Sequence, residues 1–172
     1  MLTELPDFNA EDAEVEVIEH PEAATDRSAA RRVALQILYE LDCVAHPVGE
    51  VIANRLQEED VPRKVQKYVH TLAEGVIANL PALDTFIQRY ASEFPLDQVA
   101  IVDRNILRMA VFELAAQQNT AISVIIAEAM ELANLYGAEG SLRFVNGVLG
   151  AIANENTDES RQLVVSESEK EE

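Results

Sequence analysis

Residues 102–152 divide into three blocks, and each block places apolar residues on one face of a helix. The blocks read VDRNILRMAVFEL, VIIAEAMELANLYGAEGS and LRFVNGVLGAI. In the first block the apolar residues recur at helical spacings of three and four: Val102, Ile106, Met109, Ala110 and Leu114. Gly137 can end the second helix in the left-handed conformation, and Gly140 or Ser141 can begin the third. The stretch therefore predicts three consecutive helices.

Gly147 lies in the interior of the third predicted helix. Glycine in a helix interior costs about 1 kcal/mol relative to alanine, so its presence there needs a reason. We interpret Gly147 as a point where this helix packs closely against a neighbouring helix.

The rest of the chain carries the same helical spacing, interrupted by prolines and short turns. Seven helices are predicted, at about 28–42, 48–58, 62–80, 82–92, 98–117, 122–135 and 141–153. The connections are short, and no pair of segments reads convincingly as two paired strands. The pattern therefore favours an all-α bundle.

The net charge of −18 is concentrated at the two ends of the chain. Residues 1–26 carry nine acids and no lysine or arginine, while residues 155–172 carry seven acids and two bases. We interpret both ends as acidic disordered tails, and residues 27–154 as one helical domain that is only mildly acidic. An alternative for the first tail is an acidic arm that folds over a basic patch and competes with nucleic acid.

The single cysteine, Cys43, excludes an internal disulfide and suits a reducing compartment. The N-terminal stretch is acidic and does not read as a signal peptide. No apolar run approaches the roughly 18 residues of a membrane span. We therefore expect a cytoplasmic protein that does not enter a membrane.

The sequence contains no recognisable catalytic or cofactor motif. A Walker A loop, a GxSxG motif and an HExxH motif are all missing from it. Cys43 is followed by His46, but no residue is evident that would orient a Cys/His dyad or form an oxyanion site. We therefore expect neither an enzyme nor a cofactor.

Glu113, Glu128 and Glu131 are the best candidates for metal ligands. Helical bundles that bind two metal ions use several carboxylates together with Glu-x-x-His motifs, and this sequence has no such motif. We interpret these glutamates as solvated or ion-paired, with Arg104 or Arg108 as partners. No metal site is expected.

A basic and partly aromatic surface is the remaining candidate for function. Three arginines lie in the first turns of the first helix, where cations oppose the helix dipole: Arg27, Arg31 and Arg32. They fit contacts to phosphates, or equally an ordinary solvated face. Three aromatic residues can offer ring faces to unstacked bases, or belong to the core: Tyr39, Tyr136 and Phe144.

The blocks ILRMAVFEL, IAEAMELANLYGAEGS and FVNGVL, in this order and spacing, resemble the C-terminal half of the NusB family of bacterial transcription antitermination factors. RRVALQILYELD at 31–42 resembles the first helix of that family, so the resemblance covers about 27–154. It implies an all-α bundle of about seven helices. It also implies binding of boxA-type single-stranded RNA from ribosomal RNA transcripts, together with NusE, a small-subunit ribosomal protein. The partners would form part of the RNA polymerase antitermination complex, and the protein would be a monomer or homodimer.

The resemblance also implies roles for individual residues. Those matching the RNA-binding positions of the family are Arg27, Arg31, Arg32, Tyr136, Ser141, Arg143 and Phe144. Those matching positions that face NusE are Tyr39 and Asp103.

Two other functions remain open. The arginine cluster is sparser than in the family, which favours a helical protein-interaction module on a NusB scaffold with weak or no RNA binding. A related helical domain also precedes an RNA methyltransferase domain in some enzymes, but no cofactor motif is present here.

Overall fold

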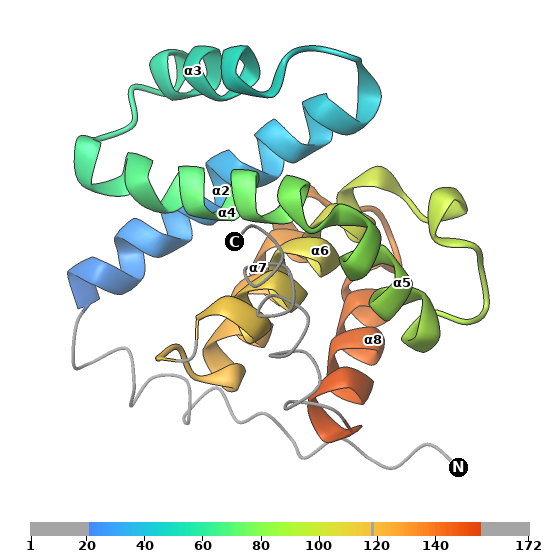
Figure 1. Cartoon of the computed structure of the whole chain (residues 1–172). Helices are drawn as coiled ribbons and strands as arrows, with labels where there is room; N and C mark the ends of the chain where they lie inside the picture. Colours follow the sequence, from blue (N-terminus) through green and yellow to red (C-terminus); the bar gives the residue numbers. More distant parts are fainter. Residues whose placement is uncertain (1–20, 118, 156–172) are drawn as a thin grey trace, which may run out of the picture.

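The computed structural model of the protein describes residues 21–117 and 119–155, and all regular structure in these ranges is helical (Figure 1). The elements are α2 (Pro21–Cys43), α3 (Val48–Glu58), α4 (Arg63–Ala78), α5 (Leu80–Tyr90), the 3-10 helix η1 (Leu96–Gln98), α6 (Ile101–Ala116), α7 (Ile122–Tyr136) and α8 (Ser141–Glu155). The predicted all-α bundle of about seven helices is confirmed.

The first helix is longer than the sequence analysis predicted. α2 begins at Pro21, seven residues before the expected start, so residues 21–26 of the predicted disordered arm are helical. Proline fits the first turn of a helix, and the alanines that follow it favour the helical conformation. Residues 1–20 and 156–172, the remainder of the two predicted tails, lie outside the described residues.

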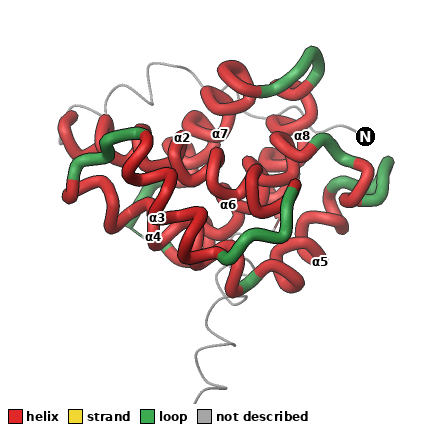
Figure 2. The backbone as a smooth tube through the Cα atoms, turned by 90° about the horizontal axis from the view of Figure 1, so that it is seen from above, coloured by secondary structure: helices red, strands yellow, loops and turns green. Residues whose placement is uncertain are grey.

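α6 is the centre of the bundle, and α2, α4, α5, α7 and α8 all pack against it (Figure 2). Its residues from Asn105 to Ala115 are buried on every side of the helix, and not only along the predicted apolar stripe. The buried polar side chains of α6 are Asp103, Asn105, Arg108 and Glu113. Because a buried charge is costly unless it is paired, the ion pairs of Arg108 and Glu113 help determine how α2 and α5 attach to α6.

The apolar core has two parts. The larger part surrounds α6 and includes Leu38, Leu72, Phe86, Leu107 and Leu149. The smaller part lies between α2, α3 and α4 and includes Ile37, Val51, Ile52, Leu56 and Val69. α3 is thereby held beside α2, where it forms one wall of a groove described below.

Two glycines have opposite surroundings. A Cβ at Gly75 on α4 would overlap the ring of Phe112 on α6, so these two helices approach more closely than alanine would allow. Gly147 on α8 is exposed, and a Cβ there would meet no atom within 4 Å. The interpretation of Gly147 as a close-packing position was therefore wrong.

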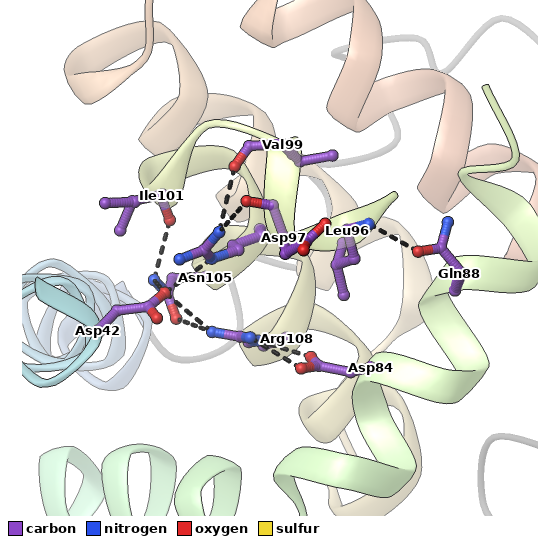
Figure 3. A network of polar contacts seen from close by, with 10 residues as sticks. Asp42, Asp84, Gln88, Leu96, Asp97, Val99, Ile101, Asn105 and Arg108 are labelled. Carbon is purple, nitrogen blue, oxygen red and sulfur yellow. Dashed lines mark hydrogen bonds and ion pairs between the residues drawn. The ribbon is translucent and has the colours of Figure 1, made fainter. Parts of the chain in front are cut away.

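Asp42, near the end of α2, is the centre of a polar network that joins three helices (Figure 3). Its Oδ2 accepts hydrogen bonds from Arg104 Nε at 2.8 Å, Asn105 Nδ2 at 3.0 Å and Arg108 Nη1 at 3.1 Å, all on α6. Arg108 also donates to both carboxylate oxygens of Asp84 on α5, at 2.7 and 2.8 Å. The network therefore attaches both α2 and α5 to α6.

The charges in this network alter the titration of Asp42. Burial raises the pKa of the Asp42 carboxyl group, but the hydrogen bonds from Arg104 and Asn105 and the nearby arginine charges outweigh burial. The pKa of Asp42 is consequently lowered from its ordinary value. The two arginines of α6 thus pair with aspartates, and not with the glutamates that the sequence analysis gave them as partners.

Candidate nucleic-acid and protein interface

Arg31 is the most buried of the three arginines at the start of α2, with 3% of its surface exposed. Its Nε and Nη2 donate to the two carboxylate oxygens of Glu113 on α6, at 2.8 and 2.9 Å. Its Nη1 lies 3.3 Å from Glu128 on α7. Burial lowers the pKa of Arg31, but the bond and charge of Glu113 outweigh that effect and raise it. All three guanidinium nitrogens therefore face carboxylates inside the protein.

Arg27 is half-buried and is held by two neighbours. Its Nη1 donates to the Thr120 hydroxyl at 2.8 Å, and its guanidinium lies 4.9 Å above the ring of Tyr68 on α4. Burial and the charge of Glu113 raise the pKa of Tyr68 to about 12, so this phenol stays neutral at physiological pH. Arg27 thus retains access to solvent on the side of α2 that faces α4.

Arg32 has surroundings that differ from those of Arg27 and Arg31. It is half-exposed, and within the described ranges it makes no ion pair. Gln36 and Tyr39 follow it at four and seven positions, which places all three on one face of α2. The three arginines therefore point in different directions, and Arg32 is the one that shares a face with Tyr39.

Tyr39 and Tyr136 line the same groove, although they are far apart in the sequence. The groove has a volume of about 750 Å³ and lies between α2, α3, the start of α6 and the end of α7. Both rings are accessible, Tyr39 with 44% and Tyr136 with 41% of its surface exposed. The resemblance implies a contact with NusE for Tyr39 and a contact with RNA for Tyr136, and both residues thus line one surface.

Several polar atoms near the groove are buried without a hydrogen-bond partner in the described part of the chain. Gln36 Oε1 and Arg55 Nε belong to residues that line the groove, and Asp103 Oδ1 follows the lining residue Val102. Asp103 is 7% exposed. Buried polar atoms normally find partners, so these three atoms are unusual among the described residues.

Gln36 and Arg55 were not among the site residues predicted from the sequence. The position of Gln36 on the Tyr39 face of the first helix was a usable signal. Arg55 offered none, because its place in the groove depends on how α3 packs beside α2.

The turn between α7 and α8 is ordered by Ser141. This residue is 3% exposed, and its Oγ accepts a hydrogen bond from the backbone N–H of Ala138 at 2.9 Å. Gly140 adopts the left-handed conformation with φ of 88°, whereas Gly137 is extended, contrary to the expectation that Gly137 would be left-handed. A Cβ at Gly137 would lie 2.5 Å from the Cβ of Ser141, so Gly137 permits the close approach in this turn.

The first turn of α8 carries the other candidate RNA contacts. Arg143 is exposed and makes no ion pair within the described ranges. Phe144 is partly buried and packs against the large core, which leaves part of its ring accessible. Next to them, Leu142 is also exposed, so an apolar and a cationic side chain lie together after the turn.

Residues 28–154 match the model of the NusB family. The chain belongs to the NusB family. Transcription antitermination protein NusB of Roseiflexus castenholzii is 39% identical over 140 residues, which is 80% of this chain and 99% of that protein. The protein of the same name from Dehalococcoides mccartyi (strain ATCC BAA-2266 / KCTC 15142 / 195) is 35% identical over 138 residues, covering 80% of this chain and 96% of its own length.

Solved structures of NusB proteins share the fold. T. maritima NusB superposes with a TM-score of 0.72 at 31% identity, over 79% of this chain and 96% of that one. A chain from the crystal structure of antitermination factors NusB and NusE in complex with double-stranded RNA has a TM-score of 0.70 at 26% identity, over 76% of this chain and 97% of its own length.

Two of the three glutamates that were weighed as metal ligands have other partners in this NusB-family chain, and the third, Glu131, is exposed. Glu113 and Glu128 both face Arg31, and Glu128 also accepts a hydrogen bond from Ser28 Oγ at 2.8 Å. Among the described residues, no group of three or more histidine, cysteine, aspartate or glutamate side chains is arranged to hold a metal ion. In those residues there is also no helix with the length and apolar character to cross a membrane.

Proposed function

We propose that this protein is a transcription antitermination factor that binds boxA-type single-stranded RNA of ribosomal RNA transcripts together with NusE. Its relatives are named transcription antitermination protein NusB, and a similar solved structure contains NusB and NusE in complex with double-stranded RNA. It acts in the cytoplasm as part of the RNA polymerase antitermination complex, and it is not an enzyme. The observation that carries the proposal is that Tyr39 and Tyr136 share one groove, with Arg32 on the Tyr39 face of α2.

RNA binds along the end of α7 and the start of α8. Tyr136 and Phe144 offer ring faces to unstacked bases, which is the usual way that proteins recognise single-stranded RNA. Arg32 and Arg143 contact phosphates, because both are accessible and neither is paired with a carboxylate in the described ranges. Arg31 and Ser141 are buried, so they support the RNA surface by fixing α2 and the turn before α8.

NusE binds the side of the groove formed by α2 and α6. The exposed ring of Tyr39 supplies contact area there. Asp103 lies in the first turn of α6 with 7% of its surface exposed, and its carboxylate contacts NusE there. Each protein then supplies part of the RNA site, so the pair binds RNA more tightly than either protein alone.

The second candidate function is a helical module that binds NusE but binds RNA weakly or not at all. The orientation of the arginines favours it, because Arg31 is buried and Arg27 faces α4. That arrangement leaves Arg32 and Arg143 as accessible cations near the groove and the turn that make no ion pair in the described ranges, whereas Arg55 in the groove pairs with Glu40 and Glu58. RNA binding with a steep dependence on salt would contradict this second candidate.

The test is fluorescence anisotropy of a labelled boxA-type RNA, titrated with the full chain with and without NusE from the same organism, at two salt concentrations. Tight, salt-sensitive binding that needs both proteins is expected. Arg32→Ala should weaken it, and Tyr136→Ala should cost about 1–3 kcal/mol, the range for one lost stacking contact. Arg63→Ala is the matched control, because it removes one exposed cation from α4, outside the groove.

The outcomes separate the candidates. Binding of NusE without any RNA binding would establish the interaction module. RNA affinity that falls equally for Arg32→Ala and Arg63→Ala would contradict the groove as the RNA site, because the effect would then reflect net charge alone.

A further inference from the structure

A second concave site lies where the first turns of α2 pass the first turns of α4. It has a volume of about 410 Å³, and its walls include Arg27, Lys64, Lys67 and Tyr68. Arg27 and Tyr39 are twelve residues apart on α2, which corresponds to a rotation of about 120° around the helix axis. The pocket therefore opens on a different side of α2 from the groove.

The pocket gathers positive charge in a strongly acidic protein. Three cationic side chains and one carboxylate, Asp26, line it, whereas the whole chain carries −18. Asp26 pairs with Lys64 at 3.2 Å. Lys67 is exposed and makes no ion pair in the part of the chain that the structure describes. The local charge is therefore not neutralised by the protein.

Arg27 is already oriented toward this site. The Thr120 hydroxyl accepts one of its hydrogen bonds, and the Tyr68 ring lies beneath its guanidinium. A guanidinium has five N–H donors, so this anchoring leaves donors for a ligand. An arginine held in place loses less side-chain entropy when it binds than a free one does.

The chemistry of the walls selects an anion with several acceptor oxygens. Like charges gathered in a concave site repel each other, and a bound anion relieves that repulsion. A phosphate group matches best, because it accepts charge-assisted hydrogen bonds from arginine and lysine at the same time.

We propose that the pocket between α2 and α4 binds a phosphate group, carried either by an RNA strand or by a small phosphorylated molecule. Arg27 contacts it from α2 and Lys67 from α4. Lys64 contributes more strongly when its pair with Asp26 opens. The phosphate contact expected for Arg27 then takes place here, and not in the groove that holds Tyr39 and Tyr136.

The test uses NMR to follow the backbone amide chemical shifts of the ¹⁵N-labelled full chain. The chain is titrated with inorganic phosphate and, in a separate experiment, with a single-stranded RNA. NusE is absent from both titrations. Shifts are expected around residues 64–71. Lys67→Gln should weaken binding roughly threefold to tenfold, as expected for one lost charged contact. For RNA, it should also reduce the slope of log affinity against log salt by about 0.7.

Two further variants make the test specific to the pocket. Arg63→Gln removes the same charge from α4 but lies outside the pocket, so binding should not change. Asp26→Asn should strengthen binding, because it releases Lys64.

Amide shifts that change with phosphate but not with RNA identify a small-anion site. Shifts that change with RNA but not with phosphate identify a contact to an RNA strand. Both support the proposal. The proposal is overturned if the binding of neither phosphate nor RNA is weakened by Lys67→Gln. It is also overturned if Arg63→Gln weakens binding as much as Lys67→Gln does. Because NusE is absent and the groove residues are intact, failure of the antitermination proposal would leave this result unaffected.

Discussion

The guanidinium of Arg31 on α2 and the carboxylate of Glu113 on α6 form a two-bond ion pair inside the protein, at 2.8 and 2.9 Å. Their side chains are 4% and 2% exposed. Such a pair is expensive to break, because removing one partner leaves the other charge buried and unpaired. Arg31 therefore fixes the position of α2, and the next residue on this helix, Arg32, is proposed to contact RNA.

Replacement of Arg31 by alanine should destabilise the protein by about 3–5 kcal/mol, because Glu113 would remain buried without its partner. Urea unfolding followed by circular dichroism measures this difference. Arg32→Ala removes the adjacent charge from a half-exposed position and should change stability by less than about 0.5 kcal/mol. Equal losses for the two variants would contradict the structural role of Arg31.

The double variant Arg31→Met with Glu113→Leu distinguishes the cost of an unpaired buried charge from the cost of lost packing. Replacing both partners by apolar residues removes the unpaired charge, so the double variant should be more stable than Arg31→Ala. A double variant that is as unstable as the single one would show that packing, and not charge, explains the loss.

The stabilising effect of Asp42 should be lost in acid. Its pKa is lowered in the folded state, whereas the unfolded chain titrates near the ordinary value of about 3.9. Its stabilising effect is complete above that value and is lost as the pH falls through the lower folded pKa. Urea unfolding measured from about pH 6 down to about pH 3 should therefore show stability falling below about pH 4.

Asp42→Asn provides the comparison. At neutral pH it should cost about 1–3 kcal/mol, because Arg104 and Arg108 lose a charged acceptor. The variant should also lose less stability than the wild type on acidification. Parallel pH curves for the two proteins would exclude Asp42 as a source of the acid sensitivity.

Two glycine-to-alanine substitutions should have opposite effects. Gly75→Ala should destabilise by about 1–3 kcal/mol despite the better helix propensity of alanine, because its Cβ would overlap the Phe112 ring. Gly147→Ala should stabilise by up to about 1 kcal/mol, because the site is exposed and open. Thermal unfolding measures both changes, and a destabilising Gly147→Ala would mean that the surroundings of this glycine are not open.

Ser141→Ala should lower stability by about 1 kcal/mol, because the backbone N–H of Ala138 loses its acceptor. RNA affinity should fall less than in Arg143→Ala, since Ser141 is buried and Arg143 is exposed. Chemical unfolding and RNA anisotropy on the same two variants test this. A larger loss of RNA affinity for Ser141→Ala than for Arg143→Ala would indicate that the hydroxyl itself contacts RNA.

The helices were predictable because their signals are local. The segments predicted at 48–58 and 122–135 agree with α3 and α7 to within one residue, since apolar spacing and flanking breaks act within a few turns. Even the burial of Arg31 had a usable signal. It lies three residues before Ala34 and seven before Leu38, both of which are buried, and therefore belongs to the inner face of α2.

Other features depended on tertiary packing. Asp42, Asp84 and Arg108 come from three helices, and no spacing in the sequence pairs them. The groove is a similar case, because Tyr39 and Tyr136 become neighbours only when α2 and α7 both pack against α6.

The sequence by itself determined the helices, the all-α class and the family, because each is encoded in contiguous residues and short spacings. Tertiary structure decided which cations are accessible, which acids pair with them and where a groove and a pocket form. The physical reason is that burial and ion pairing depend on distances between side chains remote in the chain. Those distances are set by how complete helices pack around α6.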